Sequence, residues 1–332
     1  MPGRDPLLYV RARGRTALSV WALLFACGGL FTVFSPGAAA QELVPRAYVI
    51  APVGSNAIVL QYSRLSGDIQ FDGAVPITGA TAQSDLAAIG YYRAFDLFSR
   101  TASVTVNLPY GYGRFAGTAL GVPRSTTLSG LLDSSLRLSI NLIGGKAMTL
   151  PEFSGWKQGS LLGASIKIVA PTGQYDSTRL LNWGSNRWAF KPELGFSQRL
   201  GHWIVDTYVG GWFFTTNPRF FSNNAYVSGR LTQWEAPIGA FEAHLSYSVS
   251  PRLWISADAN FWRGGATSLN GVSNPRTAQQ SSRVGITASI PLTVHQSLKL
   301  SASDGAYVHY GGNYRNLSLA WQYSWIESSA HH

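Results

Sequence analysis

Apolar and polar residues alternate one by one through most of the chain after residue 56. In 253–261, every second position is apolar: Leu253, Ile255, Ala257, Ala259 and Phe261. Successive side chains of a β-strand point to opposite faces, so each such stretch has one apolar and one polar face. This period of two predicts strands and not helices.

The alternation predicts about twelve strands, an even number as in single-chain outer-membrane barrels. The expected ranges are 57–66, 84–95, 101–111, 131–143, 159–170, 188–199, 203–215, 234–249, 253–263, 281–292, 297–308 and 314–325.

The links between these strands differ in length in a regular way. Tight links at 96–100, 200–202, 250–252 and 293–296 mostly alternate with long links at 67–84, 112–130, 171–187, 216–233 and 264–280. The long link 144–158 is the exception, because it falls on the short side. Short turns at one end and long loops at the other predict a transmembrane antiparallel up-and-down β-barrel.

Aromatic residues gather near the expected strand ends, where the interfacial girdles of a barrel lie. They are Tyr91, Tyr92, Tyr110, Tyr112, Trp183, Trp188, Trp203, Trp234, Trp262 and Trp325.

Residues 1–40 have the features of a cleaved secretory signal peptide. Four arginines precede the apolar run 17–34, and Ala38-Ala39-Ala40 offers a cleavage site of small residues. We therefore expect a signal peptide at 1–40, an N-terminal periplasmic lead-in at 41–56, the barrel at 57–325 and a short tail at 326–332.

Composition narrows the class of protein further. The 332 residues are 45% hydrophobic but only 13% charged, against about 25% charged in an average soluble domain. An ordinary cytosolic enzyme does not fit this composition. No second apolar run approaches the roughly 20 residues that a membrane-spanning helix needs, which excludes a helical bundle.

The basic charge does not point to nucleic acid. Without residues 1–40, which carry four of the arginines and one aspartate, the formal charge falls from +10 to +7. The remaining cations are scattered, whereas nucleic-acid binding needs a clustered stripe. The expected partners are the lipid bilayer of the outer membrane and a small-molecule solute, with the oligomeric state left open.

One run of the sequence resembles a known family. The run is Ala170-Pro171-Thr172-Gly173-Gln174-Tyr175-Asp176, followed by Asn182, Gly184 and the stretch 186–195. It is similar to a family of transporter-like proteins named for the MetA pathway of phenol degradation. Shorter pieces at 46–48, 51–54, 95–98 and 319–323 extend the resemblance along the chain. The resemblance implies an outer-membrane β-barrel and a link to phenol-like compounds.

The polar phase of the alternation predicts which charged residues face the lumen. These are Arg93, Arg137, Lys167, Lys191, Glu193, Asp206, Glu242, His244, Asp258, Arg283 and Lys299. Charge inside a barrel must be either hydrated or paired, so this set indicates either a water-filled conduit of mixed charge or a network of ion pairs. Trp254 and Trp262 share the face of Asp258, where they would either stack an aromatic solute or fill the core.

The long link 171–187 holds the candidates for an extracellular constriction, namely Gly173, Tyr175, Asp176 and Asn182. These residue types are common in tight turns, so they could simply shape an extracellular turn. Alternatively, the link folds inward and narrows the extracellular opening of the barrel.

These patterns favour a channel for passive uptake of small hydrophobic or aromatic compounds, not an enzyme. One alternative is a lipid hydrolase of the outer-membrane phospholipase type, with His244 and Ser246 on one strand and Asp258 on the next. Another is a barrel that is purely structural. The remaining histidines are isolated and no glycine-rich phosphate loop is present, so we expect no metal and no cofactor.

Overall fold

The structure is a computed structural model that describes residues 43–327 apart from 71–76, 120–121, 225–227 and 251. The expected signal peptide, residues 1–40, and most of the expected tail, residues 328–332, lie outside the described residues. Within the described part, no helix is both long and apolar enough to cross a bilayer.

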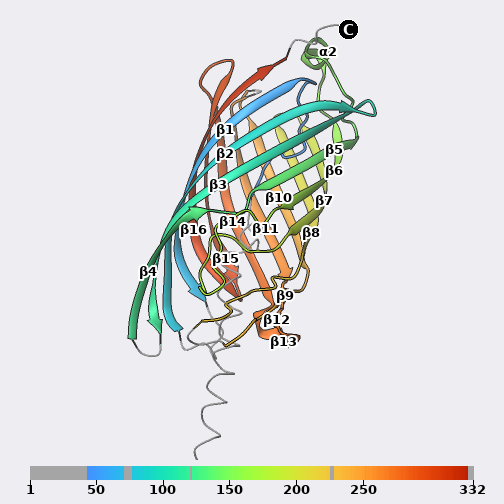
Figure 1. The fold of residues 1–332 in the computed structure, drawn as a ribbon. Coiled ribbons are helices and arrows are strands. Elements are labelled where there is room, and N and C mark those ends of the chain that lie inside the picture. The colour runs from blue at the N-terminus through green and yellow to red at the C-terminus, as the bar shows by residue number, and fades with distance from the viewer. Residues whose placement is uncertain (1–42, 71–76, 120–121, 225–227, 251, 328–332) are drawn as a thin grey trace, which may run out of the picture.

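Twelve antiparallel strands form a closed barrel (Figure 1). Strands that follow one another in the ring are paired, and the barrel closes where β1 pairs with β16 along the full length of both. The strands are β1 (Ser55–Gln70), β2 (Ile77–Leu97), β3 (Arg100–Ala119), β5 (Ser135–Ile143), β6 (Ser160–Val169), β7 (Ala189–Leu200), β8 (Trp203–Phe214), β10 (Ile238–Ser248), β11 (Trp254–Gly264), β14 (Gln279–Pro291), β15 (Gln296–Val308) and β16 (Gly311–Ile326).

The period-two pattern separates the two faces of the wall as the sequence predicts. On β10, Phe241 and Leu245 are 46% and 45% exposed, whereas Glu242 and His244 between them are 3% and 2% exposed. The exposed apolar side chains recur around the ring and form the surface that contacts lipid. The polar side chains are turned into the barrel.

The two ends of the barrel differ. One end, at the top in Figure 1, carries the tight turns, the start of β1, the end of β16 and a short helix, α2 (Leu150–Gly155). We call it the short-turn end. The opposite end, the long-link end, carries the longer connections. Short turns face the periplasm in barrels of this kind.

The strands near the N-terminus are longer than the alternation predicts. β2 begins at Ile77 and β3 runs on to Ala119, where an additional strand, β4 (Val122–Leu131), pairs with its outer half. The expected links 67–84 and 112–130 are therefore largely strand, and that prediction is wrong. These outer segments are rich in Gly, Ser, Thr and Arg. Beyond the bilayer no lipid demands an apolar face, so the alternation fades although the pairing continues.

Two other links contain local structure. β9 (Gln233–Glu235), β12 (Thr267–Leu269) and β13 (Val272–Asn274) form a small sheet at the long-link end, followed by the short 3₁₀ helix η3 (Pro275–Thr277). The single strand expected at 234–249 is thus divided into β9 and β10. Pro237 lies at the division, and proline cannot donate the backbone hydrogen bond that a continuous strand would need there.

The segment before β1, expected as an N-terminal periplasmic lead-in at 41–56, reaches into the barrel. Residues 43–51 line the cavity inside the lumen, together with side chains from the barrel wall. We call residues 43–53 the plug. Its last residue is fixed at the short-turn end, where the Val53 amide donates to the carbonyl of Met148 at 2.8 Å.

Candidate functional site

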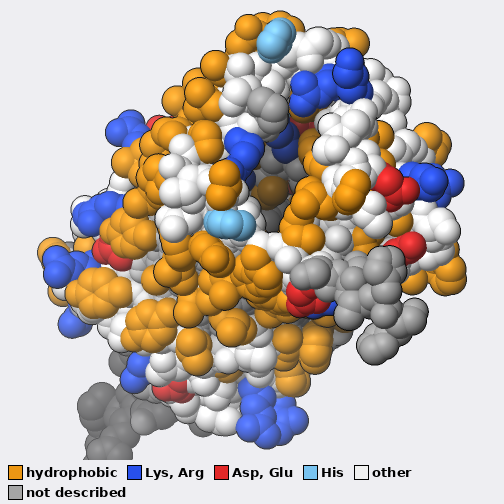
Figure 2. Space-filling view, turned by 90° about the horizontal axis from the view of Figure 1, so that it is seen from above, with side chains coloured by type: hydrophobic (Ala, Val, Ile, Leu, Met, Phe, Trp, Pro, Cys, Tyr) orange, Lys and Arg blue, Asp and Glu red, His pale blue; other side chains and the backbone are white. Residues whose placement is uncertain are grey.

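A cavity of about 810 Å³ lies inside the barrel between the plug and the wall. Its wall residues come from strands all around the ring, from Ser324 near the short-turn end to Asn107 and Asn316 deeper inside. Figure 2, seen from the short-turn end, shows a hollow with Lys and Arg side chains around it. None of the described lining residues belongs to the long links at the opposite end.

Tyr48 anchors the plug to β6 and β7. Its ring lies over Gly163 and Gly195, which are direct partners in the pairing of these strands. Its hydroxyl lies 2.8 Å from Ser165 Oγ and donates to Glu193 Oε1 at 3.0 Å. A buried tyrosine that finds its polar partners in this way is a specific anchor.

Arg46 and Ala47 fix the plug to the neighbouring strands. The Arg46 amide donates to Asp206 Oδ2 at 3.2 Å, and its guanidinium donates to Ser248 Oγ at 2.8 Å. The Ala47 amide donates to the Tyr208 hydroxyl at 3.0 Å. The plug thus lies against one side of the barrel, and the cavity extends along the other side.

A network of ion pairs occupies the wall beside Tyr48. Lys191 Nζ lies 2.5 Å from Glu193 and 2.9 Å from Glu242, and Arg137 lies 3.0 Å from Glu193. Both glutamates are less than 9% exposed. Buried carboxylates of this kind need such partners, because desolvation of an unpaired charge is costly.

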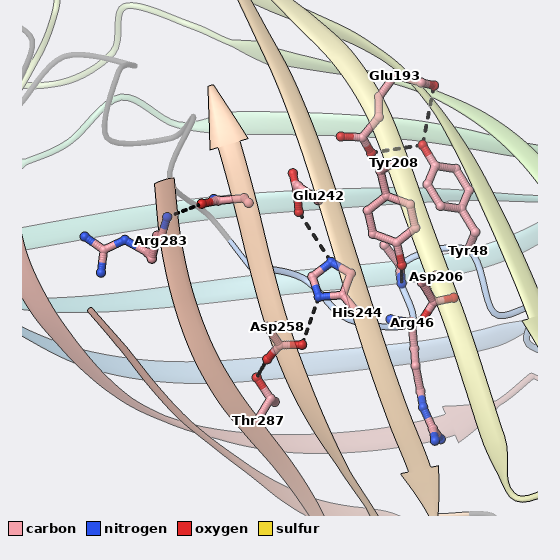
Figure 3. A network of polar contacts seen from close by, with 12 residues as sticks. Arg46, Tyr48, Glu193, Asp206, Tyr208, Glu242, His244, Asp258, Arg283 and Thr287 are labelled. Atoms are coloured by element: carbon pink, nitrogen blue, oxygen red, sulfur yellow. Dashed lines mark hydrogen bonds and ion pairs between the residues drawn. The ribbon is translucent and has the colours of Figure 1, made fainter. Parts of the chain in front are cut away.

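His244 and Asp258 are paired, but Ser246 does not join them. His244 Nδ1 lies 2.8 Å from Asp258 Oδ1, and Thr287 donates to Asp258 Oδ2 at 2.7 Å (Figure 3). The Ser246 hydroxyl is buried and makes no hydrogen bond within the described residues. A serine hydrolase needs its base within hydrogen-bond reach of the nucleophile, and here the three side chains also face the lumen instead of lipid. The geometry does not support the hydrolase alternative.

Ten of the eleven charged residues expected in the lumen lie on its side of the wall. Three of them, Asp206, His244 and Arg283, are buried behind other side chains. Seven line the cavity itself, namely Arg137, Lys167, Lys191, Glu193, Glu242, Asp258 and Lys299. Their role in a solute path stays a prediction.

Arg93 is the exception and requires a correction. It shares its face of β2 with the exposed residues Ile89 and Tyr91, and it forms a 2.8 Å ion pair with Glu327 at the end of β16. The outward face of β2 carries a charge here because the strand is leaving the apolar belt. Its neighbour Tyr92 lines the cavity instead.

The aromatic residues expected near the strand ends divide into two groups. Trp188, Trp203 and Trp234 are each 45–46% exposed, as girdle residues would be. Trp183 and Trp262 are buried, at 6% and 1% exposure. Trp262 donates to Gln279 and packs with Trp212 and Ile238 in an apolar cluster inside the barrel, so it fills the core.

Trp254 lines the cavity, with the guanidinium of Arg46 lying 4.4 Å from the centre of its ring. Arg46 therefore covers the face of Trp254, one of the two tryptophans that the sequence indicated as possible stacking surfaces for an aromatic solute.

The link 171–187 folds inward at the long-link end. Trp183 packs on Phe115, on the inner face of β3, and Leu181 reaches the cluster around Phe220 and Phe221. Asp133 holds the two ends of this link together by accepting hydrogen bonds from the Gly173 and Ser185 amides at 2.8 and 2.9 Å. Burial raises the pKa of the Asp133 carboxyl above its ordinary value, although these donors oppose the shift.

The four constriction candidates build the turns of this link. Gly173 and Gly184 are in such close contact that a Cβ on either would clash with the other. Asp176 accepts from the Thr178 amide and hydroxyl, which lowers the pKa of its carboxyl, and Asn182 donates to the Asp176 carbonyl at 3.1 Å. Tyr175 donates to the Arg219 carbonyl at 3.1 Å and so ties the link to its neighbour. A narrowing of the solute path by these residues stays a prediction.

The alternation along the chain did not indicate the residues that hold the plug: Arg46, Tyr48, Gly163, Gly195 and Tyr208. One signal was present, since Gly163 and Gly195 lie on the polar phase of adjacent strands. Glycine inside a strand often marks the close approach of another segment. Among the described residues, no group of three or more His, Cys, Asp or Glu side chains is arranged to hold a metal ion.

The apolar outer belt, the polar interior and the unequal ends define an outer-membrane β-barrel. The chain belongs to the family described as "Putative MetA-pathway of phenol degradation", which it matches over residues 66–319. This agrees with the resemblance seen in the sequence.

The fold is similar to that of solved outer-membrane proteins. An outer membrane channel from Pseudomonas putida F1 aligns with a TM-score of 0.69 and 19% identity, covering 86% of this chain and 100% of that one. The transport unit of the autotransporter AIDA-I from Escherichia coli aligns with a TM-score of 0.51 and 10% identity, covering 90% and 97%. No curated protein gave a significant sequence match. These likenesses agree with a chain that lies in the outer membrane.

Proposed function

We propose that the barrel is a channel for passive uptake of small solutes across the outer membrane and that the plug controls their passage. The observation that supports this most directly is the large cavity inside the barrel, one side of which is formed by the plug. Side chains fill the interior of eight-stranded barrels, and the interior widens as the number of strands rises. Here a separate segment fills part of the space, and it is held by noncovalent contacts that can break and re-form.

The proposed solutes are small hydrophobic or aromatic compounds. Family membership supports this choice through its link with phenol degradation. The cavity volume is also within the range of about 300–1,000 Å³ that is usual for small-molecule sites.

Planar-bilayer recording of the purified protein tests the channel. We expect unitary current steps with long closed periods, since the plug occupies the lumen in the structure. Heat-denatured protein is the control and should give none. Absence of unitary steps at both polarities would overturn the channel function and favour a structural barrel.

Liposome swelling tests the preference for aromatic solutes. Phenylalanine and glutamine are of similar size and neither crosses lipid readily, but only phenylalanine has an aromatic ring. Proteoliposomes should swell faster in isotonic phenylalanine. Equal rates would leave a channel without aromatic preference.

A further inference from the structure

Lys299 stands in the middle of a hydroxyl-rich part of the cavity wall, on the side away from the plug's anchors. Ser289 is its direct partner on β14, and Ser297 and Ser301 are the next lumen-facing residues on its own strand. Ser318 on β16 is the partner of Ser301. All four serines line the cavity, and no hydrogen bond of their hydroxyl groups is found within the described residues.

The carboxylates of the cavity wall are all engaged elsewhere. Glu193 and Glu242 pair with Lys191, and Glu193 also pairs with Arg137. Asp258 acts on Lys299 electrostatically, but both of its oxygens already accept hydrogen bonds, from His244 and Thr287.

Lys299 is therefore a cation that has no hydrogen bond or ion pair with any described residue. A half-buried ammonium group inside a barrel is stabilised by water or by an anion. The Lys299 ammonium has three N–H donors and no acceptor, and each of the four serine hydroxyls can add one more donor. Together these side chains can surround an anion with hydrogen-bond donors.

The overall charge of the wall points the same way. Three acidic residues of the lining face six cations, namely Arg46, Arg137, Lys167, Lys191, Arg252 and Lys299. Adding the charged residues buried just behind the wall, Asp206 and Arg283, leaves this excess of three unchanged. The charge of this lining is mixed, as the sequence suggested, but with an excess of basic residues.

We propose that Lys299, with Ser289, Ser297, Ser301 and Ser318, binds the carboxylate of a small organic monoanion. This rests on the proposed function and makes its substrate class more specific, from aromatic compounds in general to aromatic acids. The ammonium supplies one positive charge and the serines supply neutral donors, which suits a singly charged group. Charge-assisted hydrogen bonds of this type are about twice as strong as neutral ones.

Binding to the purified protein in detergent tests the site without requiring conduction. Isothermal titration with benzoate is compared between the wild type, Lys299→Gln and Lys299→Arg. Lys157→Gln is the matched control, because it removes one positive charge from the link between β5 and β6, outside the cavity. Benzamide is the neutral analogue of the ligand, and inorganic phosphate is the competing anion.

The expected result is that Lys299→Gln weakens benzoate binding by tenfold or more, as loss of a charged hydrogen-bond donor would. Lys299→Arg and Lys157→Gln should stay within about twofold of the wild type, and benzamide and phosphate should bind weakly to every variant. The proposal is overturned if the wild type does not bind benzoate, if Lys299→Gln binds it equally well, or if phosphate binds as tightly. Benzoate binding without unitary currents would leave the site standing and remove the channel function.

Discussion

A Cβ atom on Gly195 would overlap the ring of Tyr48, so the plug fits against β7 only because position 195 has no side chain. Gly163, the direct partner of Gly195 on β6, has the same relationship to the ring. Two wall residues and one plug residue therefore form a close-packed contact on the inner wall of the barrel. Displacing the ring should release the plug, because the Tyr48 hydroxyl would lose Ser165 and Glu193 as well.

The first prediction concerns this contact. Gly195→Ala should displace Tyr48 and raise the open probability in planar-bilayer recordings several-fold. Gly159→Ala is the matched control, since a Cβ at Gly159 meets no atom within 4 Å. If both variants conduct like the wild type, the contact between Tyr48 and Gly195 does not hold the plug.

The second prediction concerns the ion-pair network. Lys191→Met leaves Glu242 without its ion pair to Lys191 and Glu193 with Arg137 alone. Removal of one partner from a buried pair costs about 3–5 kcal/mol, so the midpoint of urea unfolding should fall well below that of the wild type. Lys157→Met, outside the cavity, should leave it nearly unchanged. An unaltered midpoint for Lys191→Met would mean that water in the lumen already solvates these charges.

The third prediction concerns the link 171–187. The two oxygens of the Asp133 carboxylate accept hydrogen bonds from the Gly173 and Ser185 amides. In Asp133→Asn one of these oxygens is replaced by an NH₂ group, so at least one of the two amides loses its acceptor. The link should loosen, and trypsin should cleave after the exposed Arg179 several-fold faster. Asp68→Asn, which changes an exposed carboxylate on β1, is the control. Equal cleavage rates would show that Asp133 does not hold the link.

The fourth prediction concerns ion selectivity. The excess of basic residues on the cavity wall should make open channels prefer chloride over potassium, which the zero-current potential in a KCl gradient measures. Lys299→Glu reverses one of these charges and should move that potential toward zero. A wild-type channel that prefers potassium would contradict the charge inventory of the wall.

The strands of the barrel could be predicted from the sequence more accurately than the plug that lies inside them. Alternation such as that of 253–261 marks each strand within the bilayer, because lipid on one side and water on the other impose it. It fades in the outer halves of β2 and β3, where both faces are polar. Arg93 was assigned to the wrong face for the same reason, since it lies where the apolar belt ends.

The plug could not be predicted from local pattern. Residues 43–53 form no regular element of their own, and their position depends on contacts with residues more than a hundred positions away, such as Asp206 and Tyr208. In the sequence, only the glycines at 163 and 195 indicate that another segment packs against these strands. Contacts between residues so far apart in the chain form only in the folded barrel, so they leave no local pattern in the sequence.

If movement of the plug opens the channel, a reversible cross-link between the plug and the wall should close it. The Ala47 amide contacts the Tyr208 hydroxyl at 3.0 Å, so cysteines in the double variant Ala47→Cys/Tyr208→Cys stand about one tyrosine side chain apart. A reducible bis-thiosulfonate linker of that length can join them. The only native cysteine, Cys27, lies in the predicted signal peptide.

Single-channel recording of this double variant is the decisive measurement, with each single variant treated alike as a control. Cross-linking should abolish the unitary currents, and reduction should restore them in the same membrane. Currents that persist unchanged while the plug is cross-linked to the wall would contradict opening by movement of the plug.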